Sequence, residues 1–113
     1  MADTRNRKLE LVRGTLDLMI LRILELQPLH GIAIADRIRQ CTQGTFHIQA
    51  GSLFPALHRL EQGGWISGEW TVNEQDRRIK AYRLTTAGKK QLFTAKRTWA
   101  RVVIAVTQVL EAD

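Results

Sequence analysis

The spacing of apolar residues changes from helical to strand-like at Gly63-Gly64, and that change limits the folds the chain can adopt. Ahead of the two glycines, apolar residues recur every three or four positions, which predicts helices. The three predicted helices span residues 15–26, 30–41 and 51–62. The glycine pair ends the third helix, because a helix C-terminus favours a residue that tolerates the left-handed conformation.

Beyond the glycines the pattern becomes that of β-strands. Residues 65–72 and 79–84 are rich in β-branched and aromatic types, and the polar stretch 73–78 joins them, which predicts a hairpin. A last helix is expected to follow Thr85 or Thr86, whose hydroxyl can cap it, and to run almost to the C-terminus. The predicted order is therefore three helices, a hairpin and a helix.

The inward faces of the second and third helices follow from the same spacing. They are Ile34, Ile38 and Cys41 in the second helix, and Leu53, Leu57 and Leu60 in the third. Pro55 is expected in the first turn of the third helix, where its missing N–H costs nothing. Cys41 is the one cysteine, so no intrachain disulfide forms. We expect it to be a small buried hydrophobe, with a thiol redox switch as the alternative.

The last helix carries a heptad pattern. Leu92, Trp99 and Val106 repeat every seven residues, as do Ala95, Val102 and Val109. Little more than two heptads are present, so we interpret this as a dimer or bundle helix. The predicted contacts with a partner subunit are Leu92, Trp99, Val102, Val106 and Val109. The same face is expected to lie near Leu16 and Ile20 of the first helix.

Charge indicates a polyanionic partner. Seventeen Lys and Arg residues outnumber eleven Asp and Glu, and residues 77–97 hold eight basic residues and no acidic one. A second basic cluster opens the chain at Arg5, Arg7, Lys8 and Arg13. Each phosphate that such residues neutralise releases a condensed counterion. A solvated basic face is the alternative, which charge alone leaves open.

The same sequence gives little support to several other classes of protein. The three histidines lie on separate predicted elements, so neither a metal site nor a catalytic constellation is visible, and we expect no enzyme, metal or cofactor. The longest wholly apolar run, residues 102–106, is far too short to span a bilayer. The first ten residues contain no apolar signal segment. We therefore expect a cytoplasmic protein.

The element order is that of the winged helix-turn-helix: a mainly α fold with a small β-hairpin and a long C-terminal helix. Residues 9–84 form the predicted DNA-binding domain and residues 85–113 the dimerisation helix. In this fold the third helix enters the major groove and the hairpin lies on the backbone or minor groove. The predicted DNA contacts are Ser52, Phe54, His58 and Arg59 on the helix, and Arg77, Arg78 and Lys80 on the hairpin. Arg59 is the main candidate for a guanine or phosphate contact.

Each of these positions has a plainer interpretation. Ser52 can be a helix cap, and His58 and Arg59 can be solvated surface. The pair Arg77 and Arg78 can be bonded to acidic neighbours, namely Glu74 and Asp76. The sequence therefore predicts an interface without deciding which of its members touch DNA.

Four segments together resemble the PadR family of bacterial transcription regulators. They are LVRGTLDLMILRIL (11–24), LHGIAIADRI (29–38), GSLFPALHRLEQGGWISGEW (51–70) and RRIKAYRLTTAGKKQL (77–92). The resemblance covers residues 9–110 and implies a homodimeric winged-helix repressor of pseudo-palindromic operators. The short C-terminus is similar to the subclass with a single dimerisation helix. Phe54 and Ile32 stand where most relatives have tyrosine, so neither position offers a phenol hydroxyl.

The leading hypothesis is a homodimeric DNA-binding repressor released by a small molecule or stress signal. In drug-sensing relatives that this chain resembles, the aromatic residue corresponding to Trp99 lines a pocket between subunits. Trp99 therefore either fills the dimer core or stacks on a flat aromatic effector. The alternative hypothesis is a protein-interaction module that uses the fold without DNA, because folds of this kind are reused widely. Steep salt dependence of duplex binding distinguishes the two.

Overall fold

The computed structural model describes residues 13–113, and this part holds four helices and one three-stranded antiparallel sheet. In chain order the elements are α2 (Arg13–Leu26), β1 (Leu29–His30), α3 (Gly31–Cys41), α4 (Ala50–Gln62), β2 (Ile66–Val72), β3 (Arg78–Leu84) and α5 (Thr86–Leu110). The predicted mainly α fold with a hairpin and a long last helix is confirmed. The basic residues Arg5, Arg7 and Lys8 and the predicted start of the domain at residue 9 lie outside the described residues.

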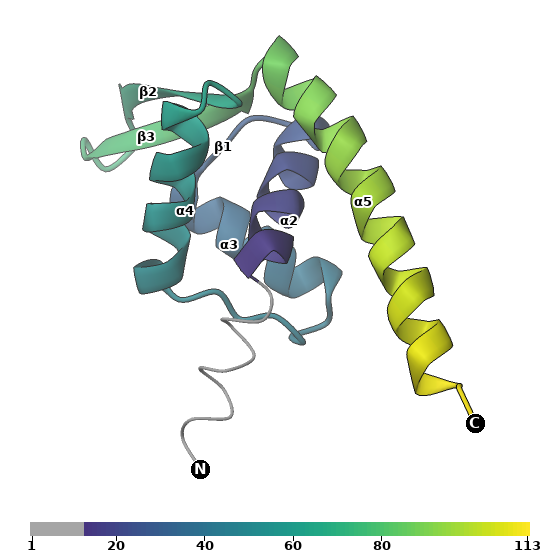
Figure 1. Ribbon diagram of the computed structural model, residues 1–113. Helices are drawn as coiled ribbons and strands as arrows, with labels where there is room; N and C mark the ends of the chain where they lie inside the picture. Colours follow the sequence, from purple (N-terminus) through teal and green to yellow (C-terminus); the bar gives the residue numbers. More distant parts are fainter. Residues whose placement is uncertain (1–12) are drawn as a thin grey trace.

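Helices α2, α3 and α4 pack together with one end of the sheet around a single core, and α5 lies beside α2 (Figure 1). Helix α2 contributes five buried side chains, more than any other element, as expected of a helix that is apolar nearly all round. The core residues are Leu16, Ile20, Leu21, Ile23, Leu24, Ile34, Ile38, Ile48, Leu53, Ala56, Leu57, Leu60, Ile66, Tyr82 and Leu92. The predicted inward faces of α3 and α4 are thus confirmed except at Cys41.

The sheet has the strand order β1-β3-β2, so β3 is central. Strands β2 and β3 form the predicted hairpin, with Ile66 opposite Leu84 at its base and Val72 opposite Arg78 near its tip. We call this hairpin the wing. The third strand, β1, pairs Leu29 with Tyr82, and no strand was predicted there. Two residues are too few to show the alternation by which strands are recognised.

Two predicted helix ends are confirmed. The Thr85 side chain caps α5, accepting a hydrogen bond from the Gly88 backbone N–H at 3.0 Å. Gly64, the second residue after the end of α4 at Gln62, has a φ of 78°, the left-handed conformation that glycine adopts without strain.

Two local predictions are wrong. Helix α4 begins at Ala50, so Pro55 lies in its second turn, where it removes a hydrogen bond to the carbonyl of Gly51. Cys41 is exposed, because it is the last residue of α3 and the turn that follows does not cover it. A buried hydrophobic role for this thiol is therefore excluded within the subunit.

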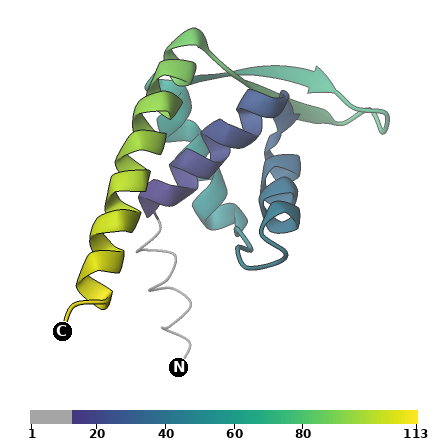
Figure 2. The ribbon, with the colours of Figure 1, turned by 90° about the vertical axis from the view of Figure 1, so that its right-hand side faces the viewer.

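Helix α5 leaves the core after its second turn, and Figure 2 shows its C-terminal half extending past the other helices. Leu92 is 1% exposed and belongs to the core of its own subunit, so the prediction that it contacts a partner is corrected. The remaining predicted contact residues are 44% to 75% exposed: Trp99, Val102, Val106 and Val109. One side of α5 therefore carries apolar side chains that the subunit itself leaves uncovered.

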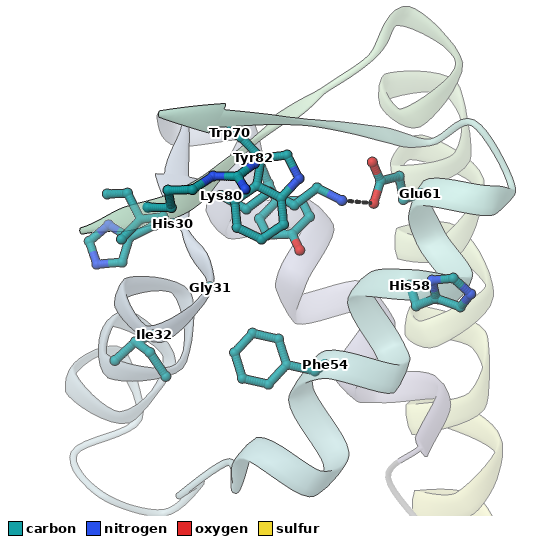
Figure 3. Close-up of a pocket in the computed structure, with 11 residues that line it drawn as sticks. His30, Gly31, Ile32, Phe54, His58, Glu61, Trp70, Lys80 and Tyr82 are labelled. Atoms are coloured by element: carbon teal, nitrogen blue, oxygen red, sulfur yellow. Dashed lines mark hydrogen bonds and ion pairs between the residues drawn. The ribbon is translucent and has the colours of Figure 1, made fainter. Parts of the chain in front are cut away.

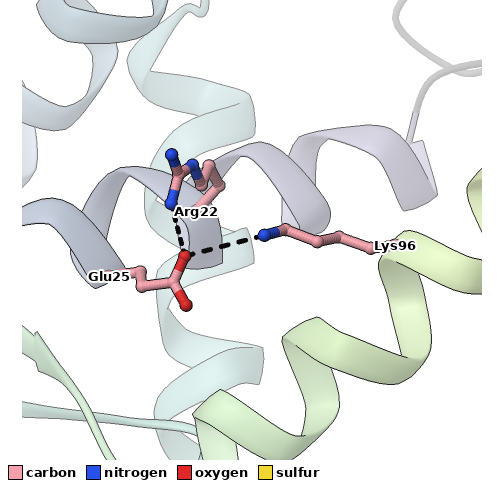
Figure 4. A network of polar contacts seen from close by, with 3 residues as sticks. All are labelled: Arg22, Glu25 and Lys96. Atoms are coloured by element: carbon pink, nitrogen blue, oxygen red, sulfur yellow. Dashed lines mark hydrogen bonds and ion pairs between the residues drawn. The ribbon is translucent and has the colours of Figure 1, made fainter.

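A small polar network joins α5 to α2 (Figure 4). The Glu25 carboxylate accepts a hydrogen bond from the Arg22 guanidinium at 2.5 Å, and the Lys96 ammonium lies 3.7 Å from the same oxygen. All three side chains are a third or more exposed, so each pair contributes at most about 1 kcal/mol. The network therefore contributes little to the stability of the fold.

Candidate nucleic-acid interface

Helix α4 presents one face to solvent along its whole length. Leu53, Ala56, Leu57 and Leu60 face the core. The exposed face consists of Ala50, Gly51, Phe54, Pro55, His58 and Gln62, and Ser52 is half-buried. Phe54 and His58 are thus placed on the face that the sequence predicted. Gln62, which was not among the predicted contacts, lies one turn beyond His58 on the same face.

Arg59 does not belong to this face. Its guanidinium donates a hydrogen bond to the Asp17 carboxylate of α2 at 2.9 Å, and both side chains are half-buried. The nearest anionic partner therefore lies within the subunit, on the side of α4 that faces α2. Contact of Arg59 with a base or phosphate therefore stays a prediction, and it would compete with the ion pair to Asp17.

The wing presents an aromatic and cationic surface toward α4. In the hairpin register Trp70 lies opposite Lys80, and Val72 opposite Arg78. The Arg78 guanidinium lies 4.9 Å from the centroid of the Trp70 ring, within the range of a cation–π contact. Because Arg78 is exposed, this contact orients its charge without removing it from solvent. Trp70 was not predicted as a site residue, although its alternation with Ile66 along β2 places it on this face.

Lys80 is tied to the C-terminal turn of α4. Its ammonium lies 2.7 Å from the Glu61 carboxylate, and the hydrogen bond between them raises the pKa of Lys80 above its ordinary value. The Lys80 chain crosses Gly68, where an added Cβ would lie 2.4 Å from the lysine Cε. Burial raises the pKa of the neighbouring Tyr82 phenol. Lys80 thus fixes the wing against α4, and its charge is partly neutralised before any phosphate approaches.

Arg77 lies at the wing tip, which is held by backbone contacts to Asn73. The Arg77 backbone N–H donates to the Asn73 side-chain oxygen at 2.9 Å, and the Arg77 carbonyl accepts from the Asn73 N–H. Within residues 14–113, neither Arg77 nor Arg78 forms an ion pair with Glu74 or Asp76. The plainer interpretation of the arginine pair, an internal ion pair, is therefore not what the structure shows.

A pocket of about 400 Å³ separates α4 from the wing (Figure 3). Its wing side carries Trp70, Arg78, Lys80 and Tyr82. The opposite side is formed by α4 and the start of α3, and its residues are Gly31, Ile32, Phe54, His58 and Glu61. Two of the predicted helix residues and two of the predicted wing residues thus border one concave surface. Chemically, this surface offers cations at one edge, aromatic rings at the centre and an apolar patch on the helices.

The described residues contain neither a candidate metal cluster nor a candidate membrane span. No group of three or more His, Cys, Asp or Glu side chains there could hold a metal ion. Among the helices of residues 13–113, none has both the length and the apolar character needed to cross a bilayer. The fold is that of a winged-helix protein, and its exposed helix and wing border one concave surface.

Comparison with known proteins gives the family. The model of the transcriptional regulator PadR-like family matches residues 20–94. An uncharacterized protein of Lysinibacillus sphaericus is 30% identical over 93 residues, which are 82% of this chain and 85% of that protein.

Solved structures of PadR regulators have the same fold. A PadR family transcriptional regulator from Eggerthella lenta is 28% identical, with a TM-score of 0.83 over 99% of this chain and 96% of that one. A PadR family regulator from Clostridium difficile is 32% identical, with a TM-score of 0.70 over 83% and 96% of the two chains. The chain belongs to the PadR-like family and is a transcriptional regulator.

Proposed function

We propose that the chain is a homodimeric repressor that binds specific duplex DNA through α4 and the wing, and that a small-molecule or stress signal releases it. One observation carries the DNA-binding part. The exposed face of α4 and the cationic wing border the same concave surface. An α-helix with its side chains is about 10–12 Å wide, which matches the major groove of B-DNA at about 12 Å.

Within that surface, His58 and Gln62 supply the polar groups of α4. Glutamine pairs with adenine through two hydrogen bonds in the major groove, and histidine can donate to a base or a phosphate. The exposed face of α4 holds no arginine or lysine, because Arg59 is bonded to Asp17. Affinity for phosphate must then come mainly from residues outside α4. Arg77 and Arg78 are exposed cations of the wing that can supply it.

Replacing both wing arginines is expected to change the salt dependence of DNA binding. In the Arg77→Ala/Arg78→Ala variant, the slope of log K against log salt should become shallower by about one unit for each phosphate that the protein no longer neutralises. Arg59→Ala is the control, because it removes one positive charge from an arginine that is bonded to Asp17. Its slope should equal that of the wild type. A shallower slope for Arg59→Ala alone would return Arg59 to the interface.

Selection of bound fragments from random duplex DNA tests the function as a whole. A sequence-specific dimer should enrich a pseudo-palindromic site whose two halves are about one helical turn apart. Binding to that site should weaken steeply with salt. No enriched site together with salt-insensitive binding would favour the alternative, a protein-interaction module of the same fold.

The dimer is proposed from the uncovered side of α5. Trp99, Val102, Val106 and Val109 are spaced three or four residues apart, so they share one side of the helix. A contiguous exposed apolar surface of this kind marks an interaction site in soluble proteins. A second copy of the chain supplies the same surface, which gives a two-fold symmetric contact.

Trp99 is where an effector would act. It is 46% exposed in the subunit, so it is either covered in the dimer or lines a pocket between the two copies. A Trp65→Phe/Trp70→Phe variant isolates its fluorescence. Saturable quenching by planar aromatic compounds would assign Trp99 to a pocket, as the proposed effector requires. If none quenches and Trp99→Ala only weakens the dimer, Trp99 is a core residue of the interface and this site for the effector is excluded.

A further inference from the structure

The first half of the exposed face of α4 contains no polar side chain. Ala50, Gly51, Phe54 and Pro55 are exposed there, and none can donate or accept a hydrogen bond through its side chain. Polar groups on this face begin only at His58. In the helix-turn-helix arrangement the N-terminal residues of the recognition helix contact the base edges. The part of α4 best placed to meet bases is therefore its apolar part.

Phe54 is held in a defined position. A Cβ added to Gly31 would lie 3.0 Å from the Phe54 Cε1 and 3.4 Å from a methyl carbon of Leu57. The ring thus rests against the backbone at the start of α3, so closely that a Cβ at Gly31 would require it to shift by a few tenths of an ångström. Because that position is fixed by packing, little side-chain freedom is lost when a ligand covers the ring.

The Phe54 ring is nevertheless accessible to a ligand from solvent. Phe54 is 44% exposed and Ile32, which follows Gly31 on α3, is 53% exposed. Both line the helix side of the pocket, on the side away from the sheet in Figure 3. Leaving two large apolar side chains in water is unfavourable, and a partner that covers them with apolar surface gains the corresponding free energy.

Duplex DNA offers one apolar group on its major-groove edges, the C5-methyl of thymine. Arg78 of the wing is exposed and borders the same pocket, so its charge is complementary to a phosphate backbone that lies beside the pocket. We propose that Phe54, extended by Ile32, reads a thymine methyl group in each half-site of the operator. This inference rests on the proposed function, and it assigns a specificity-determining role to an apolar contact.

Removing the methyl group alone tests the proposal. Each thymine of the selected site is replaced in turn by deoxyuridine, which keeps base pairing and every hydrogen-bonding group. For wild-type protein, we expect one thymine in each half-site whose replacement weakens binding about fourfold. This factor corresponds to the free energy of burying one methyl-sized group. Wild-type protein binding equally well to every substituted site would overturn the inference.

Variants of Phe54 assign the effect to its side chain. In Phe54→Ala the ratio of affinities for thymine and uracil should fall to about one, whereas Phe54→Leu, which keeps an apolar contact, should retain part of it. His58→Ala, one turn further along, should weaken both duplexes alike and keep the ratio. Thermal unfolding followed by circular dichroism checks that the variants fold. An undiminished ratio in folded Phe54→Ala would overturn the assignment.

The same experiment separates this inference from the proposed function. A selection that returns no enriched site overturns both together. A site that is bound specifically and with steep salt dependence, but without sensitivity to any thymine methyl, overturns this inference alone. Measurement of binding by fluorescence anisotropy at one fixed salt concentration makes the two duplexes directly comparable.

Discussion

Two glutamates on the uncovered side of α5, in a Val102→Glu/Val106→Glu variant, are expected to convert the dimer to a monomer and to lower operator affinity about a hundredfold or more. Both valines are exposed in the subunit, so the change leaves its core intact. Pairing two copies would bury carboxylates of like charge at one interface. The free energy needed to desolvate them exceeds the free energy that apolar burial at the interface supplies. A monomer also loses the linkage between the two half-site contacts. That linkage raises the overall affinity for the operator by about 10²–10⁴-fold.

Sedimentation velocity measures the association state, and anisotropy titration of the operator measures binding. A Thr94→Glu/Gln108→Glu variant is the matched control, because it adds the same charge at exposed positions away from the apolar side of α5. The control should remain dimeric and lose only a few-fold in affinity through its added negative charge. If the valine variant stays dimeric, or if the control dissociates equally, this side of α5 is not the interface.

A Gly88→Ala substitution is expected to destabilise the subunit by about 3 kcal/mol, near the upper end of the range for overpacking. Gly88 is buried in the first turn of α5 against the base of the wing. An added Cβ would lie 2.0 Å from the backbone oxygen of Trp65 and 2.6 Å from a methyl carbon of Leu84. A backbone oxygen cannot move aside as a side chain can, so α5 would have to shift away from the wing.

Gly51→Ala is the matched control for this prediction. Gly51 also lies in the first turn of a helix, but a Cβ added to it would meet nothing within 4 Å. Alanine there should be neutral or stabilise by about 0.5–1 kcal/mol, because it restricts the unfolded chain. Urea unfolding monitored by circular dichroism compares the two variants. Equal stabilities would show that the contact between α5 and the wing can relax at little cost.

Local sequence pattern accounts for most of the fold. Helical spacing, the glycines after α4 and the capping hydroxyl of Thr85 each act over a few residues, so a single stretch of sequence is sufficient to show them. Strand β1 is the exception, because it exists only through its pairing with β3, more than fifty residues further along. The same spacing correctly placed Phe54 and His58 on the exposed face of α4.

The ion-pair partners of the charged residues depend on long-range contacts, which local sequence patterns do not show. Arg59 is predicted from the sequence as a DNA contact, and the fold brings Asp17, 42 residues earlier, to 2.9 Å from its guanidinium. Lys80 is likewise bonded to Glu61 across the pocket. A charged side chain pairs with whichever opposite charge the fold brings near, and spacing along the chain carries no information about that neighbour.

The heptad pattern of α5 shows the same division within one helix. Leu92 and Trp99 are seven residues apart and occupy equivalent positions in the repeat, yet Leu92 is 1% exposed and Trp99 is 46% exposed. The sequence determined that both lie on one apolar side of a helix. Only the tertiary structure decided that the other helices cover the first residue and end before the second, because burial depends on what packs against a face and not on the face itself.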